Sequence, residues 1–348
     1  MLGNIPSRKK IRYPIGERLL AYLSYYNRVS KLPLQYGDLL RYEATIPVTG
    51  QNDKDTGWES VFYNESAQTE IYNSLKLIYA LLKTGGDISV MEHLTIARID
   101  FCTFGNSKPF RIRIINRLND NYDHFYVKIS DASRVYGLEL ESLLSPNYFY
   151  YLIDGETLIE EHIAGIPGDD FINRRLNTDL FNQIRIIKEF VKFNERCFAR
   201  LLGDMRSYNY VVDITPDIEG NQYRMRAIDF DQQTFEGSKR FYQPQFFKEN
   251  NPIITLGINN IGPQSVKQYQ LEERSLIAER IRSEQDRVNS LFRIFRMDEI
   301  STKDKTNQLG NELFQLHGDI GFKQAITMGE ITQLHLEKIL NKPVINWQ

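Results

Sequence analysis

Two short stretches, GDMRSYN at residues 203–209 and AIDFDQ at residues 227–232, decide how this chain is expected to fold. The first follows a helix-like stretch, and the chain between the two has the pattern of two strands joined by a turn. Such a hairpin returns the chain to its starting point. We therefore expect Asp204, Asn209 and Asp229 to lie near one another.

These side chains suit the chemistry of phosphates. A carboxylate such as that of Asp204 orients a hydroxyl group and accepts its proton, and the amide oxygen of Asn209 is a hard ligand for Mg²⁺. Asp229 supplies a second oxygen ligand; Asp231 is the alternative, because alternate residues of a strand point to the same face. Phosphoryl transfer needs mainly a metal, a carboxylate and cations. The competing interpretation is that Asp204 and Asn209 are turn residues.

With these residues in place, the sequence resembles the protein-kinase-like superfamily. The catalytic loop of that superfamily reads H-R-D-x-x-x-x-N, or H-G-D-x-x-x-x-N in the aminoglycoside and choline kinase branch. Residues 203–209 match it from the glycine onward, and I-D-F at residues 228–230 matches the small-molecule kinases. The resemblance implies that Asp204 is the catalytic base, with Asn209 and Asp229 as Mg²⁺ ligands.

The resemblance also assigns charged residues around the nucleotide. It implies that Arg206 lies near the transferring phosphate. Lys128, in FYVKIS, looks like the strand lysine that holds the α- and β-phosphates of ATP. Glu139 in the following helix looks like the ion-pair partner of that lysine, with Glu141 as the second choice.

The segment EHIAG at residues 161–165 looks like the hinge between two lobes. By similarity, the carbonyl group of Glu161 and the N–H group of Ile163 would meet the edge of the adenine. The first strand turn, GNSK at residues 105–108, holds one glycine instead of the glycine-rich cover of the phosphates. Lys108 is a candidate to supply positive charge there instead.

The favoured function is ATP- and Mg²⁺-dependent transfer of a phosphoryl group to a hydroxyl of a small molecule or a protein. Leu202 replaces the histidine that usually lies two residues before the catalytic aspartate. This departure and the single-glycine turn motivate the alternative of a pseudokinase, which acts as a nucleotide-binding or scaffold module. Transfer of AMP on the same fold is a further alternative.

The expected fold class is α+β, with the two lobes of a protein-kinase-like fold: an antiparallel-sheet lobe and a mostly helical lobe. Strand patterns at 94–104, 109–115 and 124–129 predict a meander, and residues 133–144 predict a helix with Ser133 as its N-cap. The expected segments are an N-terminal extension of unassigned role (1–93), the sheet lobe (94–163) and the helical lobe (164–348).

Composition narrows the class of protein. The chain has 348 residues, 41% of them hydrophobic, and a formal net charge of −2, which favours neither nucleic acid nor a membrane as partner. Two cysteines give no disulfide framework, and no apolar run approaches the ~20 residues of a membrane helix. We expect a soluble, cytoplasmic protein.

The histidines do not predict a zinc site, because none has a metal-ligand neighbour at useful spacing. His162, in an apolar strand, is expected to be a packed core residue. The tripeptide HGD at residues 317–319 imitates the small-molecule kinase motif, but no asparagine follows at the required position. We interpret it as a turn at the start of a helix.

Overall fold

The computed structural model describes residues 10–50, 55–176, 180–218 and 220–345. The chain forms two compact units: unit 1 is Met1–Ala132 with Phe149–His162, and unit 2 is Ser133–Tyr148 with Ile163–Gln348. Residues 1–93, expected as an extension, therefore belong to the same unit as the predicted meander. The helix predicted at 133–144 belongs to the second unit instead.

Within the described residues, unit 1 contains one antiparallel sheet in the order β1-β2-β3-β4-β5-β7-β6. Its strands are β1 (Ala44–Thr49), β2 (Asp55–Phe62), β3 (Leu94–Cys102), β4 (Phe110–Asn116), β5 (Tyr122–Ile129), β6 (Tyr151–Asp154) and β7 (Thr157–Glu161). Its helices are α1 (Glu17–Tyr25), η1 (Tyr36–Leu40), α2 (Glu65–Thr84) and η3 (Ile88–His93). The sequence pattern predicted the meander β3-β4-β5, and the sheet confirms it.

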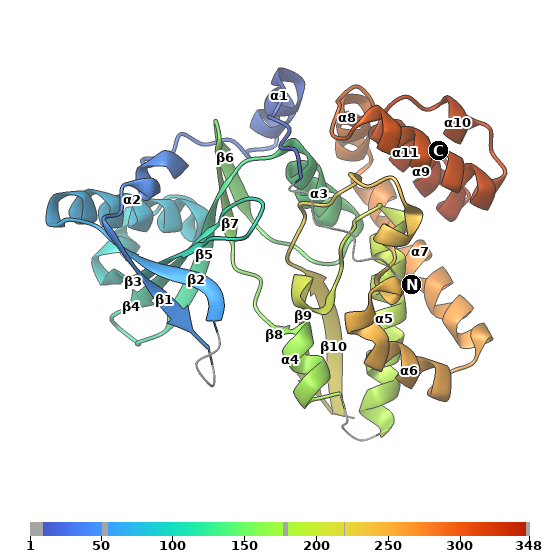
Figure 1. Cartoon of the computed structure of the whole chain (residues 1–348), viewed down its shortest axis with the longest axis horizontal. Coiled ribbons are helices and arrows are strands. Elements are labelled where there is room, and N and C mark those ends of the chain that lie inside the picture. The colour runs from blue at the N-terminus through green and yellow to red at the C-terminus, as the bar shows by residue number, and fades with distance from the viewer. Residues whose placement is uncertain (1–9, 51–54, 177–179, 219, 346–348) are drawn as a thin grey trace. The chain divides into compact units, whose positions relative to one another are not determined.

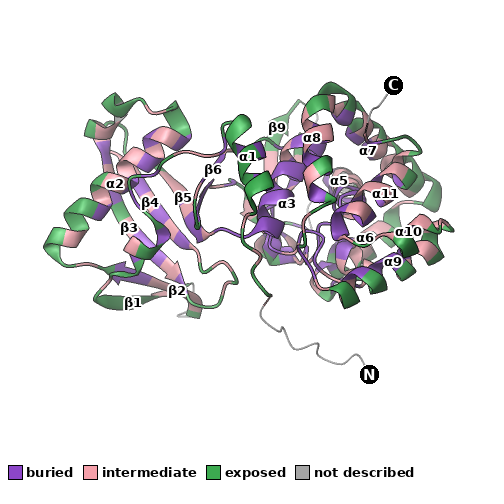
Figure 2. Cartoon of the chain, turned by 90° about the horizontal axis from the view of Figure 1, so that it is seen from above, coloured by how far each residue is buried: buried purple, intermediate pink, exposed green. Residues whose placement is uncertain are grey.

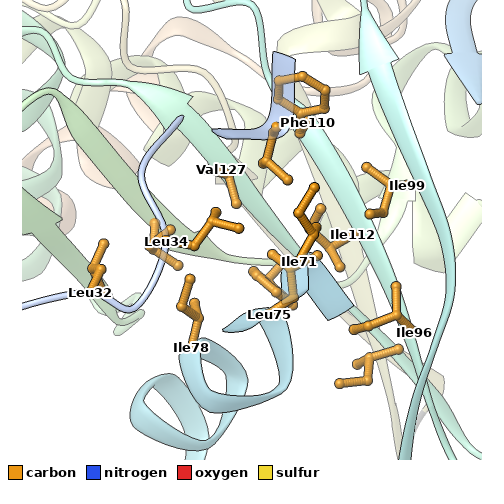
Figure 3. Packing of buried hydrophobic residues seen from close by; sticks show 14 of the residues in the cluster. Leu32, Leu34, Ile71, Leu75, Ile78, Ile96, Ile99, Phe110, Ile112 and Val127 are labelled. Atoms are coloured by element: carbon orange, nitrogen blue, oxygen red, sulfur yellow. The ribbon is translucent and has the colours of Figure 1, made fainter. Parts of the chain in front are cut away.

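The core of unit 1 lies between α2 and the sheet (Figures 1 and 3). Ile71, Leu75 and Ile78 recur at helical spacing on α2, and all three are fully buried. They face strand residues such as Ile112 and Val127 (Figure 3). Each such side chain contributes about 1.5–3 kcal/mol when it leaves water. The helix and the sheet are thus two layers around one apolar core.

One stretch of unit 1 differs from the sequence interpretation. The turn-forming residues of 47–60 predict a loop-rich stretch, but most of this stretch belongs to β1 and β2. The register pairs Val48 with Trp58, and Trp58 in turn with Cys102 of β3. Pairing across the sheet outweighs the local preference of these residues for turns.

In unit 2, a three-stranded sheet has the order β10-β9-β8, and helices form the rest of the regular structure described. The strands are β8 (Ile166–Pro167), β9 (Tyr210–Asp217) and β10 (Gly220–Ala227). The α-helices are α3 (Ala132–Leu144, which starts at the last residue of unit 1), α4 (Gly168–Arg174), α5 (Leu180–Ala199), α6 (Asn251–Asn260), α7 (Pro263–Ser283), α8 (Gln285–Phe295), α9 (Lys303–His317), α10 (Gly321–Gln324) and α11 (Met328–Leu340). Short 3₁₀ turns are η4 (Ser207–Asn209), η5 (Lys239–Tyr242), η6 (Pro244–Phe246) and η7 (Lys248–Asn250).

Helix α5 is central to unit 2, because it packs against α6, α7 and β10. Its buried face includes Ile187, Phe190, Phe193 and Cys197. Helix α3 is buried along nearly its whole length, which Figure 2 shows as a purple helix. One antiparallel sheet unit and one mostly helical unit make this an α+β protein, and the predicted fold class is confirmed at that level.

The prediction of Ser133 as an N-cap was wrong, whereas residues 317–319 do form a turn just before a helix, α10. Helix α3 begins at Ala132, so Ser133 lies inside its first turn, and the Ser133 hydroxyl donates to the carbonyl oxygen of Gln233 at 2.7 Å. At residues 317–319, Gly318 ends α9 in the left-handed conformation that suits a helix C-terminus. Asp319 then accepts a hydrogen bond from the N–H of Gly321. The tripeptide therefore ends one helix before the next begins.

Candidate functional site

The loop after α5 holds Asp204 in a constrained backbone conformation. Asp204 has a φ of 60°, in the left-handed region that residues with a side chain seldom adopt. Its N–H donates to the carbonyl oxygen of Phe241, and the N–H of Gly203 donates to that of Gln232, each at 3.1 Å. A Cβ at Gly203 would lie 2.8 Å from the Phe241 ring. Close packing on both sides therefore fixes the direction of the Asp204 side chain.

The structure brings Asn209 beside Asp204. The Asn209 amide nitrogen donates to the main-chain oxygen of Asp204 at 2.7 Å and lies 3.4 Å from its Oδ2. These contacts orient the amide so that its oxygen is the end turned away from Asp204. Asn209 is also tied to the returning strand, because its carbonyl oxygen accepts from the N–H of Ile228 at 3.0 Å. The hairpin thus returns to Asn209, as the spacing predicted.

Asp229 was predicted to end a strand, but β10 ends at Ala227 and Asp229 lies just beyond it. It acts electrostatically on Asp204. Burial raises the pKa of the Asp204 carboxyl to about 6, the Arg206 guanidinium opposes the rise, and the negative charges of Asp229 and Glu249 add to it. A carboxylate with a pKa in this range both accepts and releases protons near neutral pH.

Arg206 links two acidic groups of this site. Its Nε donates to Oδ1 of Asp204 at 2.9 Å, and its Nη1 donates to Oε1 of Glu249 at 2.8 Å. The guanidinium also lies over the ring of Phe247, 5.0 Å from its centroid. The side chain is therefore a cation held directly beside the candidate base, and its predicted place near the transferring phosphate stays a prediction.

The site contains one cation that sequence reasoning missed. Nη1 of Arg134, in the first turn of α3, donates to Oδ1 of Asp229 at 2.9 Å and to Oδ1 of Asp231 at 2.8 Å. The side chain of Arg134 is 1% exposed, whereas that of Asp229 is 35% exposed. An arginine in the first turn of a helix is the signal that was available, because the helix dipole disfavours a cation there.

Lys128 and Glu139 each have a close partner within their own unit. In unit 1, Nζ of Lys128 donates to Oε2 of Glu160 on the neighbouring strand at 2.6 Å, and Lys128 is buried. In unit 2, Glu139 is fully buried and accepts from Nη2 of Arg287 at 2.8 and 3.0 Å. Burial favours a higher pKa of the Glu141 carboxyl, but its ion pair with Arg200 and its hydrogen bonds with Ser145 and Asn147 bring the pKa below its usual value. The predicted pairing of Lys128 with Glu139 stays a prediction.

The remaining predicted residues have ordinary structural surroundings. Lys108 lies in the turn between β3 and β4, with a φ of 42°, and its carbonyl oxygen accepts from the hydroxyl of Tyr36. Glu161 ends β7, where its side chain accepts from the N–H of Tyr150. Ile163 is buried, and so is Leu202, which lies two residues before Asp204. Their proposed contacts with a nucleotide stay predictions.

The acidic, histidine and cysteine side chains of the described ranges limit the kind of metal site that the chain offers. No group of three or more His, Cys, Asp or Glu side chains among those residues is arranged to hold a metal ion unaided. Mg²⁺ does not need such a cluster, because one carboxylate and one amide oxygen suffice when phosphate oxygens and water complete its coordination. Asp229 and Asn209 are residues of the types that such a site uses. Within the same part of the chain, no helix is long and apolar enough to span a membrane.

Comparison with known proteins found no family model and no curated protein that matches the chain. Among solved structures, it is similar to the Rio2 kinase of Chaetomium thermophilum, in a crystal structure of that kinase's ADP/Mg²⁺-phosphoaspartate complex. The two share 10% sequence identity over 77% of this chain and 85% of the other, with a TM-score of 0.33. A TM-score this low does not establish a shared fold, so the function has to be argued from the site.

Proposed function

We propose that this chain is a phosphotransferase of the protein-kinase-like type, which moves the γ-phosphoryl group of ATP to a hydroxyl group with Mg²⁺ as cofactor. One observation carries the proposal. Asn209 is hydrogen-bonded to Asp204, the backbone just before Asp229 is hydrogen-bonded to Asn209, and burial together with the charges of Asp229 and Glu249 raises the pKa of Asp204 to about 6. Perturbed carboxyl groups beside further oxygen ligands mark functional sites more often than they mark turns.

Asp229 and Asn209 would hold the metal ion. Both supply hard oxygen atoms, and Mg²⁺ ordinarily keeps water and substrate phosphates as its other ligands. When bound, the ion neutralises charge along the phosphates. The hydrogen bond from the Asn209 amide nitrogen to Asp204 orients the amide oxygen for that role. The carboxylate of Asp229 and the amide of Asn209 come from two backbone segments that are hydrogen-bonded to each other through the N–H of Ile228.

Asp204 is the base in this proposal. The oxygen of the acceptor hydroxyl forms a bond to the γ-phosphorus, the bond from that phosphorus to the bridging oxygen of ADP breaks, and the hydroxyl proton passes to the Asp204 carboxylate. The adjacent Arg206 favours the ionised form of Asp204 and is proposed to meet the transferring phosphate. Positioning and charge, more than covalent chemistry, supply the catalysis in reactions of this class.

The nucleotide contacts are carried over from the resemblance. Lys128 is proposed to hold the α- and β-phosphates, and Lys108 is proposed to add charge nearby. The main chain of Glu161 and Ile163 is proposed to meet the adenine. Since Glu160 forms the close ion pair with Lys128, it is a better candidate than Glu139 for orienting that lysine.

The acceptor is proposed to be a small molecule or a protein. The I-D-F sequence at residues 228–230 favours a small molecule, and the D-M-R-x-x-N pattern that begins at Asp204 favours a protein.

Thermal unfolding with and without excess ATP and Mg²⁺ tests the proposal first. A ligand that binds only the native state at 100 times its dissociation constant adds about 2.7 kcal/mol. We expect the wild type to be stabilised, and Asp229→Ala to lose the stabilisation that depends on Mg²⁺. Absence of any shift in the wild type would remove the basis for a nucleotide site.

A second experiment separates the enzyme from the alternatives. Single-turnover reactions with ATP labelled at the γ- or the α-phosphate report phosphoryl and AMP transfer separately. We expect transfer of the γ-label by the wild type and its loss in Asp204→Ala. Nucleotide binding without transfer would favour a pseudokinase, and transfer of the α-label would favour AMP transfer.

A further inference from the structure

The cation of Arg134, in the first turn of α3, lies against the candidate metal ligand Asp229. The same nitrogen, Nη1, donates to Asp229 and Asp231, and the guanidinium carbon lies 5.9 Å from the centroid of the Phe230 ring between them. Arg134 is thus in contact with all three residues that follow Ile228.

Two hydrogen bonds converge on one oxygen of Asp229. Oδ1 accepts from Nη1 of Arg134 at 2.9 Å and from the main-chain N–H of Asp231 at 3.0 Å. Two donors on a single oxygen fix the rotation of the carboxyl group about its χ angles. The direction of the other oxygen, Oδ2, is then set by the protein before any ligand arrives, which is how residues behind a metal ligand orient it.

The arginine is itself held rigidly. Its side chain is 1% exposed, and the helix that carries it packs directly on the segment after β10. Gly137 makes this approach possible, because a Cβ there would lie 3.0 Å from Cβ of Phe230 and 3.1 Å from Cβ of Gln233. The hydroxyl of Ser133 donates to the carbonyl oxygen of Gln233 at 2.7 Å. Helix α3 and this segment therefore form one packed body.

We propose that Arg134 is the positioning residue of the metal site: it holds Asp229 in its ligating orientation and neutralises the second acid, Asp231. This inference rests on the proposed function, since it assigns Asp229 to Mg²⁺. Arg134 does not touch the reacting groups in this account. It acts through Asp229, and its loss changes how much Mg²⁺ the site needs.

The test measures the concentration of Mg²⁺ that gives half of the thermal stabilisation by a fixed excess of ATP. The decisive variant combines Arg134→Gln with Asp231→Asn, so that one positive and one negative charge are removed together and the net charge of the site is unchanged. Comparison with Asp231→Asn alone isolates the arginine. Loss of a residue that orients a metal ligand typically costs 10–100-fold in metal affinity or activity. We expect the Mg²⁺ midpoint to rise about 10-fold or more relative to Asp231→Asn.

Tyr136→Phe is the matched control on the same helix. The Tyr136 hydroxyl donates to Asp298 at 2.6 Å and has no contact with Asp229 among the hydrogen bonds described. We expect this variant to unfold at a lower temperature but to keep the wild-type Mg²⁺ midpoint. Arg134→Lys keeps the charge and is expected to fall between the wild type and the double variant.

The outcomes separate the two proposals. If the wild type is stabilised by ATP and Mg²⁺ but the midpoint of the double variant stays within twofold of that of Asp231→Asn, the positioning role of Arg134 is refuted and the proposed function stands. An equal rise in Tyr136→Phe would also refute it, because the effect would then be general loosening of α3. If the wild type shows no stabilisation, both proposals fall together.

Discussion

Removing Arg287 should destabilise unit 2 strongly, because the buried carboxylate of Glu139 would lose the guanidinium from which it accepts two hydrogen bonds. Glu139 has a side-chain exposure of 0% and Arg287 of 17%, with N–O distances of 2.8 and 3.0 Å between them. Breaking a buried ion pair by removing one partner costs about 3–5 kcal/mol. For a domain of 150–250 residues, each kcal/mol lowers the melting temperature by about 2–4 °C. Arg287→Ala is therefore expected to melt about 6–20 °C below the wild type.

A double variant that replaces both Glu139 and Arg287 by neutral residues is the control. Glu139→Gln combined with Arg287→Met removes both charges of this pair, and replacing a buried pair by neutral groups is often close to neutral for stability. We expect this double variant to recover most of the loss, measured by circular dichroism during heating. A loss below about 1 kcal/mol in Arg287→Ala would show that the pair behaves like an exposed one and would refute the reasoning.

The same variants decide what Glu139 does. If its role is to anchor α3, the double variant keeps its stabilisation by ATP and Mg²⁺. If instead it orients Lys128, as the resemblance implied, that stabilisation is lost in the double variant while folding is retained. Lys128→Met provides the reference for loss of the lysine itself.

Further outcomes are expected at other positions. Because the pKa of Asp204 is raised to about 6, phosphoryl transfer should rise with pH through about 6, where the base becomes ionised. A raised carboxyl pKa means that the folded state binds this proton more tightly than the unfolded state, so the stability contributed by Asp204 is lost as pH rises, and Asp204→Asn should melt above the wild type at pH well above 6. Gly168→Ala should destabilise unit 2 and shift Asn209, since its Cβ would lie 2.3 Å from the Tyr210 ring, as urea unfolding and Mg²⁺ titration would report. Burial lowers the pKa of His335 to about 3 from 6.5, so the protein should lose stability as pH falls through this interval, and His335→Gln should reduce that pH dependence.

Parts of the fold could be predicted because local periodicity reflects burial directly. Alternation in β4 places Phe110, Ile112 and Ile114 on one face, and all three are buried. The hairpin that returns toward Asn209 followed from spacing and turn residues alone. In contrast, β1 and β2 depend on pairing with β3, and no pattern within residues 47–60 indicated that partner.

Charge partners could not be predicted for a related reason. A glutamate on a short helix is normally solvated, and nothing near Glu139 in sequence indicates Arg287, which lies 148 residues away. A lysine at the end of a strand is typically a solvated edge residue, but β5 is an inner strand of the sheet, and Glu160 on β7 accepts a hydrogen bond from Lys128. Tertiary packing determines which charged residues form ion pairs. The sequence therefore indicated which charged residues were candidates, but not their partners.

Each of the three buried charged residues of α3 forms an ion pair with a residue outside the helix. Arg134 is paired with Asp229 and Asp231, which follow β10. Glu139 is paired with Arg287, and Glu141 is paired with Arg200. Apolar residues of similar size would make the helix about as stable, because desolvation offsets most of the attraction in a buried pair. The pairs also constrain the rotation of the helix about its axis, because their partners lie on other segments of unit 2. That rotation is the one that brings the Arg134 guanidinium to the candidate metal ligand, so the interior of unit 2 sets the geometry of its site.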